Sequence, residues 1–288
     1  MKQKIISYFR NILIKKIISP KNSEKIIIFL AKLAGISLRK LYYEEQGILK
    51  YQSSDLSGET YLIESILPKY LNENAIIFDV GANVGTYTAK LRKQFPTSII
   101  YAFEPSAYSF SILQEKTKND QNIKCYQKGL SYLSSTKELY DYGNMSGNSS
   151  HATLYPEIFE TFKQHRFSHE VYTKKETIEM TSIDDFCLSL NIDLIDFIKI
   201  DTEGHEFEVL RGAKNMIKNE KIKMIQFEFN EMNVISRVFL KDFYDLLSSY
   251  YFFRLNSNSL IPIFKYNTNN EVFKFQNIFA IQKDIYEN

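Results

Sequence analysis

Apolar residues recur along residues 47–288 in two periods that alternate with each other. Short apolar runs typical of buried strands occur at 76–80, 98–103, 123–127, 197–201, 222–229, 251–255 and 277–282. Between many of them, apolar residues return every three or four positions, as in amphipathic helices, at 61–71, 87–94, 108–118, from 206 and at 241–249. Strands alternating with helices predict a parallel sheet wrapped by helices, and such sheets bind ligands at the carboxyl ends of their strands.

Residues 132–180 interrupt this alternation. The runs KELYDYG at 137–143 and KETIEM at 175–180 predict two additional strands. Between them lies GNMSGNSSHATLYPEIF, rich in glycine, serine and asparagine. A long polar loop in a compact domain is usually functional or disordered, so this segment is a candidate part of a binding site.

The first 20 residues have a helical period with a basic character. Most of the lysine and arginine side chains lie off a face that carries the apolar residues Ile5, Ile6, Phe9, Ile12, Leu13 and Ile17. Such a helix can lie on an anionic membrane or pack on its own domain, and the pattern leaves both open. Pro20 ends it, and a second helix at about 24–34 stops at Gly35. We therefore expect a helical extension, 1–46, and a main domain, 47–288.

Composition narrows the classes of protein. The 288 residues carry a formal net charge of only +2, which argues against nucleic-acid binding. Two cysteines, Cys125 and Cys187, cannot build a disulfide framework, so a reducing compartment fits. No apolar run approaches the roughly 20 residues that span a bilayer. We expect a cytoplasmic protein, with peripheral contact at the inner face of the membrane if the first helix binds lipid.

The stretch FDVGANVGTYT, residues 78–88, predicts a turn that binds a nucleotide-like ligand. Asn83 stands where a dinucleotide fingerprint needs its second glycine, and no Gly-Lys-Ser/Thr follows as in a P-loop. The ligand that remains is S-adenosylmethionine, whose carboxylate suits the helix N-terminus near Thr86. Asp79 suits its ammonium group, and Glu104, at the end of the next strand, can accept hydrogen bonds from both ribose hydroxyls.

The predicted donor site comprises Asp79, Gly81, Asn83, Gly85 and Glu104. Each part also has a purely structural interpretation: a plain turn, a helix cap for Asp79 and a surface charge for Glu104. We favour donor binding because the pieces agree in order and spacing.

The stretch DFIKIDTEGHEFEVLRGA, residues 196–213, resembles the signature D-x-I-K-I-D-x-E-G-x-E-x-x-x-L-x-G-A of the FkbM-type methyltransferase family. FDVGANVG, YAFEPS, KGLS, TSIDDF and FEFN also follow that family's order, so the resemblance covers about 47–282 and omits the N-terminal helices. It implies a class I, Rossmann-like methyltransferase fold with a mostly parallel sheet, and S-adenosylmethionine as donor. It further implies O-methylation of a sugar, glycan or other natural-product hydroxyl.

The same resemblance places Asp201, Glu203, Gly204 and Glu206 beside the active site. Asp201 ends its strand and is the best candidate to accept the proton of the acceptor hydroxyl. His205 is the rival base, because its unperturbed pKa of about 6.5 suits neutral pH, although a residue at a helix start often faces solvent. Glu203 is the third catalytic candidate, whereas for Glu206 we favour a capping role.

Glu228 ends the following strand and either faces the same cleft or pairs with a neighbouring cation. Together with Asp201 and Glu203 it could supply oxygen ligands to a divalent metal such as Mg²⁺. The residues therefore leave open a metal-assisted reaction.

Residues 143–155 are a candidate lid on the acceptor side, in which Ser149 and His151 could bond a sugar. We thus assign Ser149, His151 and Glu228 to acceptor binding. Two alternatives remain for the whole chain: a metal-assisted methyltransferase of a different small molecule, and a non-catalytic donor-binding scaffold at the membrane. The acceptor and the oligomeric state are left open.

Overall fold

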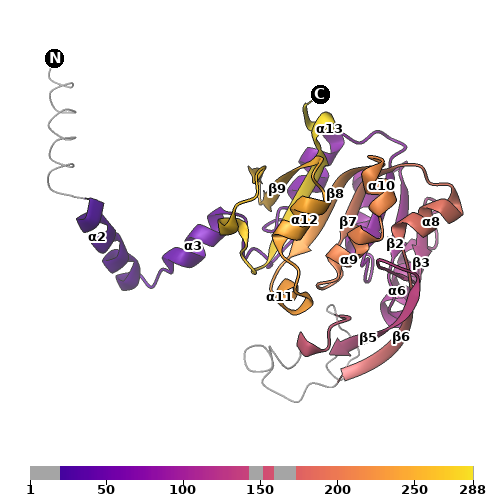
Figure 1. Ribbon diagram of the computed structural model, residues 1–288, viewed down its shortest axis with the longest axis horizontal. Helices are drawn as coiled ribbons and strands as arrows, with labels where there is room; N and C mark the ends of the chain where they lie inside the picture. Colours follow the sequence, from indigo (N-terminus) through magenta and orange to yellow (C-terminus); the bar gives the residue numbers. More distant parts are fainter. Residues whose placement is uncertain (1–19, 143–151, 159–172, 288) are drawn as a thin grey trace. The chain divides into compact units, whose positions relative to one another are not determined.

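The computed structural model describes residues 20–142, 152–158 and 173–287 (Figure 1). The chain divides into two compact units, Met1–Gln46 and Gly47–Asn288. The first unit contains helices α2 (Pro20–Leu33) and α3 (Leu38–Glu45). The helix predicted for the first 20 residues, with its membrane contact, lies outside the described residues apart from Pro20. In the part of the chain that is described, every helix is too short or too polar to cross a lipid bilayer.

The second unit is built on one large sheet. Within the described residues its strand order is β10-β9-β11-β8-β7-β1-β2-β3. Five neighbouring strands are parallel: β1 (Ile76–Val80), β2 (Ile99–Phe103), β3 (Ile123–Tyr126), β7 (Ile195–Ile200) and β8 (Ile222–Phe229). Antiparallel pairing joins the remaining three, β9 (Tyr250–Asn256), β10 (Ser259–Pro262) and β11 (Gln276–Gln282). The predicted α/β fold with a mostly parallel sheet is confirmed.

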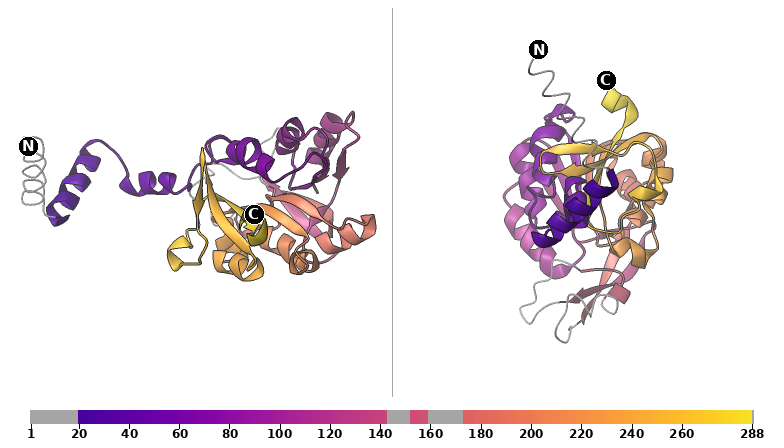
Figure 2. Two further views of the ribbon diagram at one scale, coloured as in Figure 1. Left: turned by 90° about the horizontal axis from the view of Figure 1, so that it is seen from above. Right: turned by 90° about the vertical axis from the view of Figure 1, so that its left-hand side faces the viewer.

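Helices cover both faces of this sheet, because its central strands are apolar on both sides. Phe78 and Ile198 join one core, with α8 (Ile183–Leu190), α9 (Glu206–Arg211), α10 (Lys214–Lys218) and α12 (Leu240–Leu246). The adjacent residues Ile77 and Phe197 join the other, with η1 (Leu62–Ile66) and α5 (Thr86–Gln94). Figure 2 shows these two sets of helices on opposite sides of the sheet.

Of the remaining helical segments in the described residues, all but the 11-residue α6 are short. They are α4 (Glu59–Tyr61), η2 (Leu67–Lys69), α6 (Ala107–Thr117), α11 (Met232–Ser236), η3 (Thr268–Asn270) and α13 (Lys283–Glu287). The single helix predicted at 61–71 is instead a succession of α4, a π-helical η1 and a 3₁₀-helical η2. Pro68 explains the change, since proline lacks an N–H donor and disrupts a regular α-helix.

The segment that interrupts the alternation forms a second, smaller sheet. In the described residues its order is β4-β6-β5, with β4 (Gly129–Leu130), β5 (Ser135–Tyr142) and β6 (Thr173–Thr181). The two additional strands predicted there are β5 and β6, paired antiparallel along their full length. Leu139, Ile178 and Met180 form an apolar cluster on this sheet, against which Ala152 and Leu154 pack. This cluster forms one wall of the site described next.

Candidate active site

The turn after β1 is held in its shape by packing against two neighbouring strands. Gly81 and Gly85 have φ values of +78° and +80°, and Asn83 has +47°. The N–H of Gly81 donates to the carbonyl of Phe103 at the end of β2. A Cβ on Gly81 would lie 1.8 Å from the carbonyl oxygen of Asp201. Glycine is therefore required here for close backbone contact as well as for its positive φ.

Glu104 presents a carboxylate that the backbone holds in place. Its Oε2 accepts from the N–H of Asn83 at 2.8 Å, and its Oε1 accepts from the N–H of Ser106 at 2.9 Å. Glu104 is only 7% exposed. Burial raises the pKa of its carboxyl group to about 7, although the hydrogen bonds from the two N–H groups act in the opposite direction. Each oxygen keeps a second lone pair, so the carboxylate can still accept from two hydroxyls. Its geometry suits the predicted ribose contact.

Asp79 lies deeper than its predicted role suggests. It is fully buried and does not line the pocket. Its Oδ2 accepts from the hydroxyl of Thr88 in the first turn of α5 at 2.6 Å. Within the described residues its Oδ1 has no hydrogen-bond partner. Burial raises the pKa of Asp79, whereas the ammonium of Lys199 lowers it. Its contact with the donor's ammonium stays a prediction.

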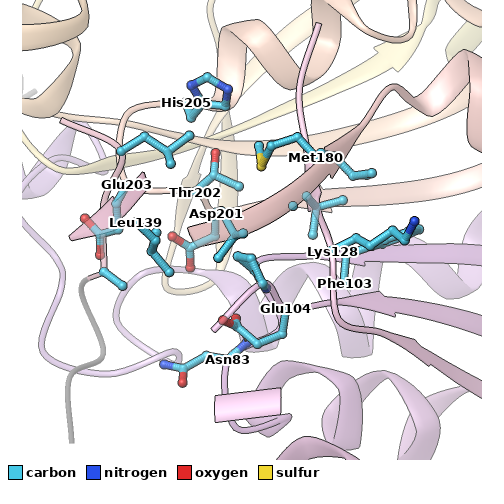
Figure 3. A pocket seen from close by; sticks show the side chains of 18 of the residues that line it. Asn83, Phe103, Glu104, Lys128, Leu139, Met180, Asp201, Thr202, Glu203 and His205 are labelled. Atoms are coloured by element: carbon cyan, nitrogen blue, oxygen red, sulfur yellow. The ribbon is translucent and has the colours of Figure 1, made fainter. Parts of the chain in front are cut away.

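A pocket opens where the strand ends of the large sheet face the small sheet (Figure 3). Its empty space, counted together with the part that is open to solvent, is about 750 Å³. The apolar wall comes from the small sheet. The polar wall gathers six of the predicted site residues, namely Gly81, Asn83, Glu104, Asp201, Glu203 and His205. Gly85 and Glu228 are outside this lining.

Asp201 follows β7 and is the partly exposed carboxylate of the polar wall. Its N–H donates to the carbonyl of Val80 at 3.0 Å, which ties the loop after β7 to the end of β1. Its Oδ2 accepts from Lys199 Nζ at 2.9 Å. The side chain is 37% exposed, whereas that of Lys199 is 6% exposed. One oxygen is thus fixed, while the carboxylate as a whole remains accessible.

The loop between Asp201 and α9 is shaped by Glu206. Its Oε1 accepts from the N–H groups of Thr202 at 2.8 Å and Gly204 at 3.1 Å. Burial raises the pKa of Glu206 to about 7. Glu203 has a φ of +53°, and Gly204 one of +97°. These donors lie ahead of α9 and not in its first turn, so Glu206 orders the loop that carries Glu203 rather than capping the helix in the way we favoured.

His205 is buried, and the expectation that it faces solvent was wrong. It is 6% exposed, because the small sheet and the segment 152–155 cover it. Its Nε2 lies 2.9 Å from the hydroxyl of Ser131, and its Nδ1 lies 3.0 Å from that of Tyr155. Burial, aided by Lys137, lowers its pKa to about 4. Because a neutral imidazole has one donor and one acceptor nitrogen, these contacts occupy both.

Glu228 lies among other carboxylates. Its side chain accepts from the amide of Asn230, and burial together with Asp201 and Glu203 raises its pKa well above the usual value. We predicted that Glu228 either faces the cleft or pairs with a neighbouring cation. Within the described residues it forms no ion pair with a lysine, arginine or histidine. Among the same residues no three histidine, cysteine or acidic side chains come together to hold a metal ion.

The predicted acceptor residues Ser149 and His151 lie outside the described residues. The adjoining segment 152–155 is described, and it crosses from the small sheet to the loop after β7. The backbone of Thr153 pairs with Tyr140 in both directions at 2.9 Å, and its hydroxyl donates to the carbonyl of Glu203 at 3.1 Å. Sequence reasoning missed the contact of Thr153 with Glu203 and those of Ser131 and Tyr155 with His205, because no local pattern indicates partners 50 or more positions away.

The sequence is similar to those of several known methyltransferases, three of which are described here. Methyltransferase 1 of Beauveria bassiana is 30% identical over 149 residues, which are 49% of this chain and 59% of that protein. The hexuronic acid methyltransferase AglP of Haloferax volcanii is 25% identical over 197 residues, 68% of this chain and 73% of that protein. The 2-O-methyltransferase NoeI of Sinorhizobium fredii is 22% identical over 218 residues, 75% of this chain and 86% of that protein.

The chain spans about three fifths of the length of the first curated relatives that it matches, 59% and 62%. A family model described as the methyltransferase FkbM domain matches residues 79–252, more than half of the chain. This match begins at Asp79 and includes Glu104, the loop after β7 and Glu228. The chain belongs to the FkbM methyltransferase domain family.

Proposed function

We propose that this protein is an S-adenosylmethionine-dependent O-methyltransferase that acts on a hydroxyl of a sugar or glycan. The observation that carries this proposal is that two carboxylates of different character line one pocket. Glu104 is buried and held by two backbone N–H groups, whereas Asp201 is partly exposed and held at one oxygen by Lys199. The first suits recognition of a diol, and the second suits acceptance of a proton.

The residues present fit the methyl donor. Glu104 can accept from two ribose hydroxyls, and the turn at Gly81 and Asn83 forms the neighbouring part of the lining. The adjacent α5 begins at Thr86, so its N-terminus suits a carboxylate. When bound, S-adenosylmethionine supplies a methyl group on a positively charged sulfur, which keeps the electron pair of the broken bond.

Asp201 then acts on the acceptor. Its carboxylate accepts the proton of the hydroxyl as that oxygen forms its bond to the methyl carbon, and later releases the proton to solvent. General-base assistance of this kind typically contributes about 10²–10⁴-fold to a rate. His205 is less suited to this role, because Ser131 and Tyr155 occupy both of its nitrogens.

The names of two relatives support the acceptor class. The hexuronic acid methyltransferase matches 68% of this chain, and the 2-O-methyltransferase matches 75% of it. At identities of 25% and 22%, these names support a sugar as the acceptor, and they do not indicate which position is methylated.

The test is a transfer assay with isotopically labelled S-adenosylmethionine. The acceptors are an oligosaccharide containing hexuronic acid, a neutral oligosaccharide and a phenolic natural product, and mass spectrometry locates the added methyl group. We expect label on a sugar hydroxyl, and about 10²–10⁴-fold slower labelling with the Asp201→Asn variant. Label on the phenol alone would overturn the acceptor class, and label on the uronate carboxyl would overturn hydroxyl methylation.

A second arm separates the remaining alternatives. Each assay is repeated with EDTA and then with added Mg²⁺. Activity lost in EDTA and restored by Mg²⁺ would establish a metal-assisted reaction. Donor binding in calorimetry without transfer to any acceptor would instead favour the non-catalytic scaffold.

A further inference from the structure

We propose that Lys199 is a positioning residue that couples the donor side of the active site to its acceptor side. It fixes one oxygen of Asp201 and balances the buried charge of Asp79. Its effect on methyl transfer rests on the proposed function, whereas its effect on donor binding can be tested without any acceptor.

A row of polar side chains crosses the centre of the large sheet at this point. Asp79 on β1 is directly opposite Lys199 on β7, and Lys199 is directly opposite Gln226 on β8. Residues opposite each other on parallel strands point to the same face, so the three side chains are neighbours. Their exposed fractions are 0%, 5% and 1%. These two charged side chains and one polar side chain are therefore buried together on one face of the large sheet.

Two helical elements cover the row. From α5, the Tyr87 hydroxyl donates to Gln226 Oε1, and the Tyr87 ring centroid lies 5.0 Å from Lys199 Nζ. From α4, the Glu59 carboxylate accepts from Gln226 Nε2 at 3.3 Å. Burial raises the pKa of Tyr87, so its hydroxyl stays protonated and can donate. Lys90 is a second cation that acts on Glu59.

Lys199 is therefore charged in spite of its burial. Burial alone would lower its pKa, but Asp201, Asp79 and Glu59 together raise it above the ordinary value. A buried ion pair usually stabilises a fold less than apolar residues of the same volume would. A lysine at the centre of the sheet is thus poorly explained by stability, and its contacts lead to two predicted site residues instead.

The lysine acts on the two aspartates in different ways. On Asp201, which lines the pocket, it holds Oδ2 at 2.9 Å and so limits the rotation of the carboxylate. On Asp79 it opposes the rise in pKa that burial causes, and Thr88 gives further support by bonding Oδ2. Without the ammonium group, Asp79 would bind a proton at a higher pH and would lose its attraction for a cationic group of the donor.

The experiment compares Lys199→Met with a matched control, Gln226→Met, which removes an equally buried polar side chain from the adjacent strand. S-adenosylhomocysteine is the probe for donor binding, measured by calorimetry between pH 5.5 and 9. For Lys199→Met we expect at least a tenfold loss of affinity at pH 7 and recovery toward alkaline pH, where Asp79 ionises. For Gln226→Met we expect affinity within about threefold of the parent and an unchanged pH profile.

Transfer kinetics complete the test, and thermal unfolding shows whether each variant is folded. We expect kcat of Lys199→Met to fall about 100-fold with little change in the acceptor KM. If that variant does not fold, Lys199→Met combined with Asp79→Asn removes both buried charges, and kcat at saturating donor is expected to stay low because Asp201 is no longer fixed. Parent-like kcat and an unchanged pH profile in either variant would make Lys199 purely structural.

These outcomes can be told apart from failure of the proposed function. If the parent protein methylates no sugar, the acceptor class is wrong. The affinity of the same parent and variant proteins for S-adenosylhomocysteine still decides whether Lys199 supports the donor site.

Discussion

The two walls of the pocket are built in different ways. On the strand-end wall, Glu104 is bonded by the backbone N–H of Asn83, only 21 positions away, and the turn between them follows directly from β1. From the opposite wall, Thr153 reaches Glu203 on the strand-end wall across 50 positions, and Ser131 reaches His205 across 74. The first wall presents backbone donors and carboxylates, whereas the second presents the apolar cluster of the small sheet.

This difference indicates which wall tolerates change. The turn at Gly81 leaves no room for a side chain, because a Cβ would collide with the backbone of Asp201. Apolar side chains such as Leu139 and Met180 are held by packing, and packing accepts replacements of similar volume. We therefore expect the chemistry common to the family on the first wall, and acceptor selectivity on the second.

The largest effect should come from Asp201. With Asp201→Asn, kcat should fall by about 10²–10⁴-fold because the proton acceptor is lost, while donor affinity stays within about threefold. Steady-state kinetics and calorimetry measure the two quantities. His205→Gln should reduce kcat much less, since both nitrogens of His205 are already bonded, by Ser131 and Tyr155. Near-parent turnover in Asp201→Asn together with an inactive His205→Gln would reverse this assignment.

A smaller effect is expected from Glu104, and it should appear in donor binding. Glu104→Gln replaces a charged acceptor by a neutral amide, which costs roughly 1.5–3 kcal/mol per charged hydrogen bond, or about 10–100-fold in affinity. Glu179→Gln is the matched control, because that carboxylate is 69% exposed and, within the described residues, forms an ion pair with Lys128 at the surface. Equal affinities of the two variants for S-adenosylhomocysteine would place the ribose elsewhere.

The pH dependence of donor binding is a second test of the Glu104 carboxylate. Since burial raises the pKa of Glu104 to about 7, the ionised carboxylate, which accepts hydrogen bonds from the ribose hydroxyls, is lost as pH falls below 7. Affinity should be nearly constant above about pH 8 and fall by roughly tenfold between pH 8 and pH 6. Calorimetry at several pH values measures this, and Glu104→Gln should flatten the profile. A parent profile without this fall would contradict a direct role for the carboxylate.

The smallest effect concerns the opposite wall. Tyr155→Phe removes one hydrogen bond to His205, which is worth about 1 kcal/mol and corresponds to a fall in Tm of roughly 2–4 °C. Tyr132→Phe serves as control, because Tyr132 is 40% exposed and its ring contacts the guanidinium of Arg211. An unchanged Tm in Tyr155→Phe would mean that this contact contributes little to holding the segment 152–155 in place.

Much of the strand-end wall could be predicted from sequence. The turn from β1 into α5 follows from glycines four positions apart after an apolar run, and Glu104 follows from its place at the end of the next strand. Asp201 follows in the same way from β7. Gly81, Glu104 and Asp201 line one pocket, because parallel strands bring their carboxyl ends to the same edge; their roles stay predictions.

Other features of the polar wall depended on contacts that a local pattern does not contain. Asp79 stands at the right place in the motif, yet it is buried behind the pocket against Thr88 and Lys199. His205 stands at a helix start, yet it is covered by the small sheet. In both cases burial is decided by elements far away in the chain, and burial also sets the pKa of each group.

The sequence by itself determined the family, the α/β class and the strand ends at which the chemistry gathers, since these depend on apolar periods and on short motifs with fixed spacing. Only the tertiary structure decided that Lys199 lies between Asp79 and Asp201, and that Tyr155 and Ser131 occupy both nitrogens of His205. The physical reason is that ionisation and hydrogen bonding depend on the surroundings of a side chain. Those surroundings come from strands and loops that are adjacent in space and distant in sequence.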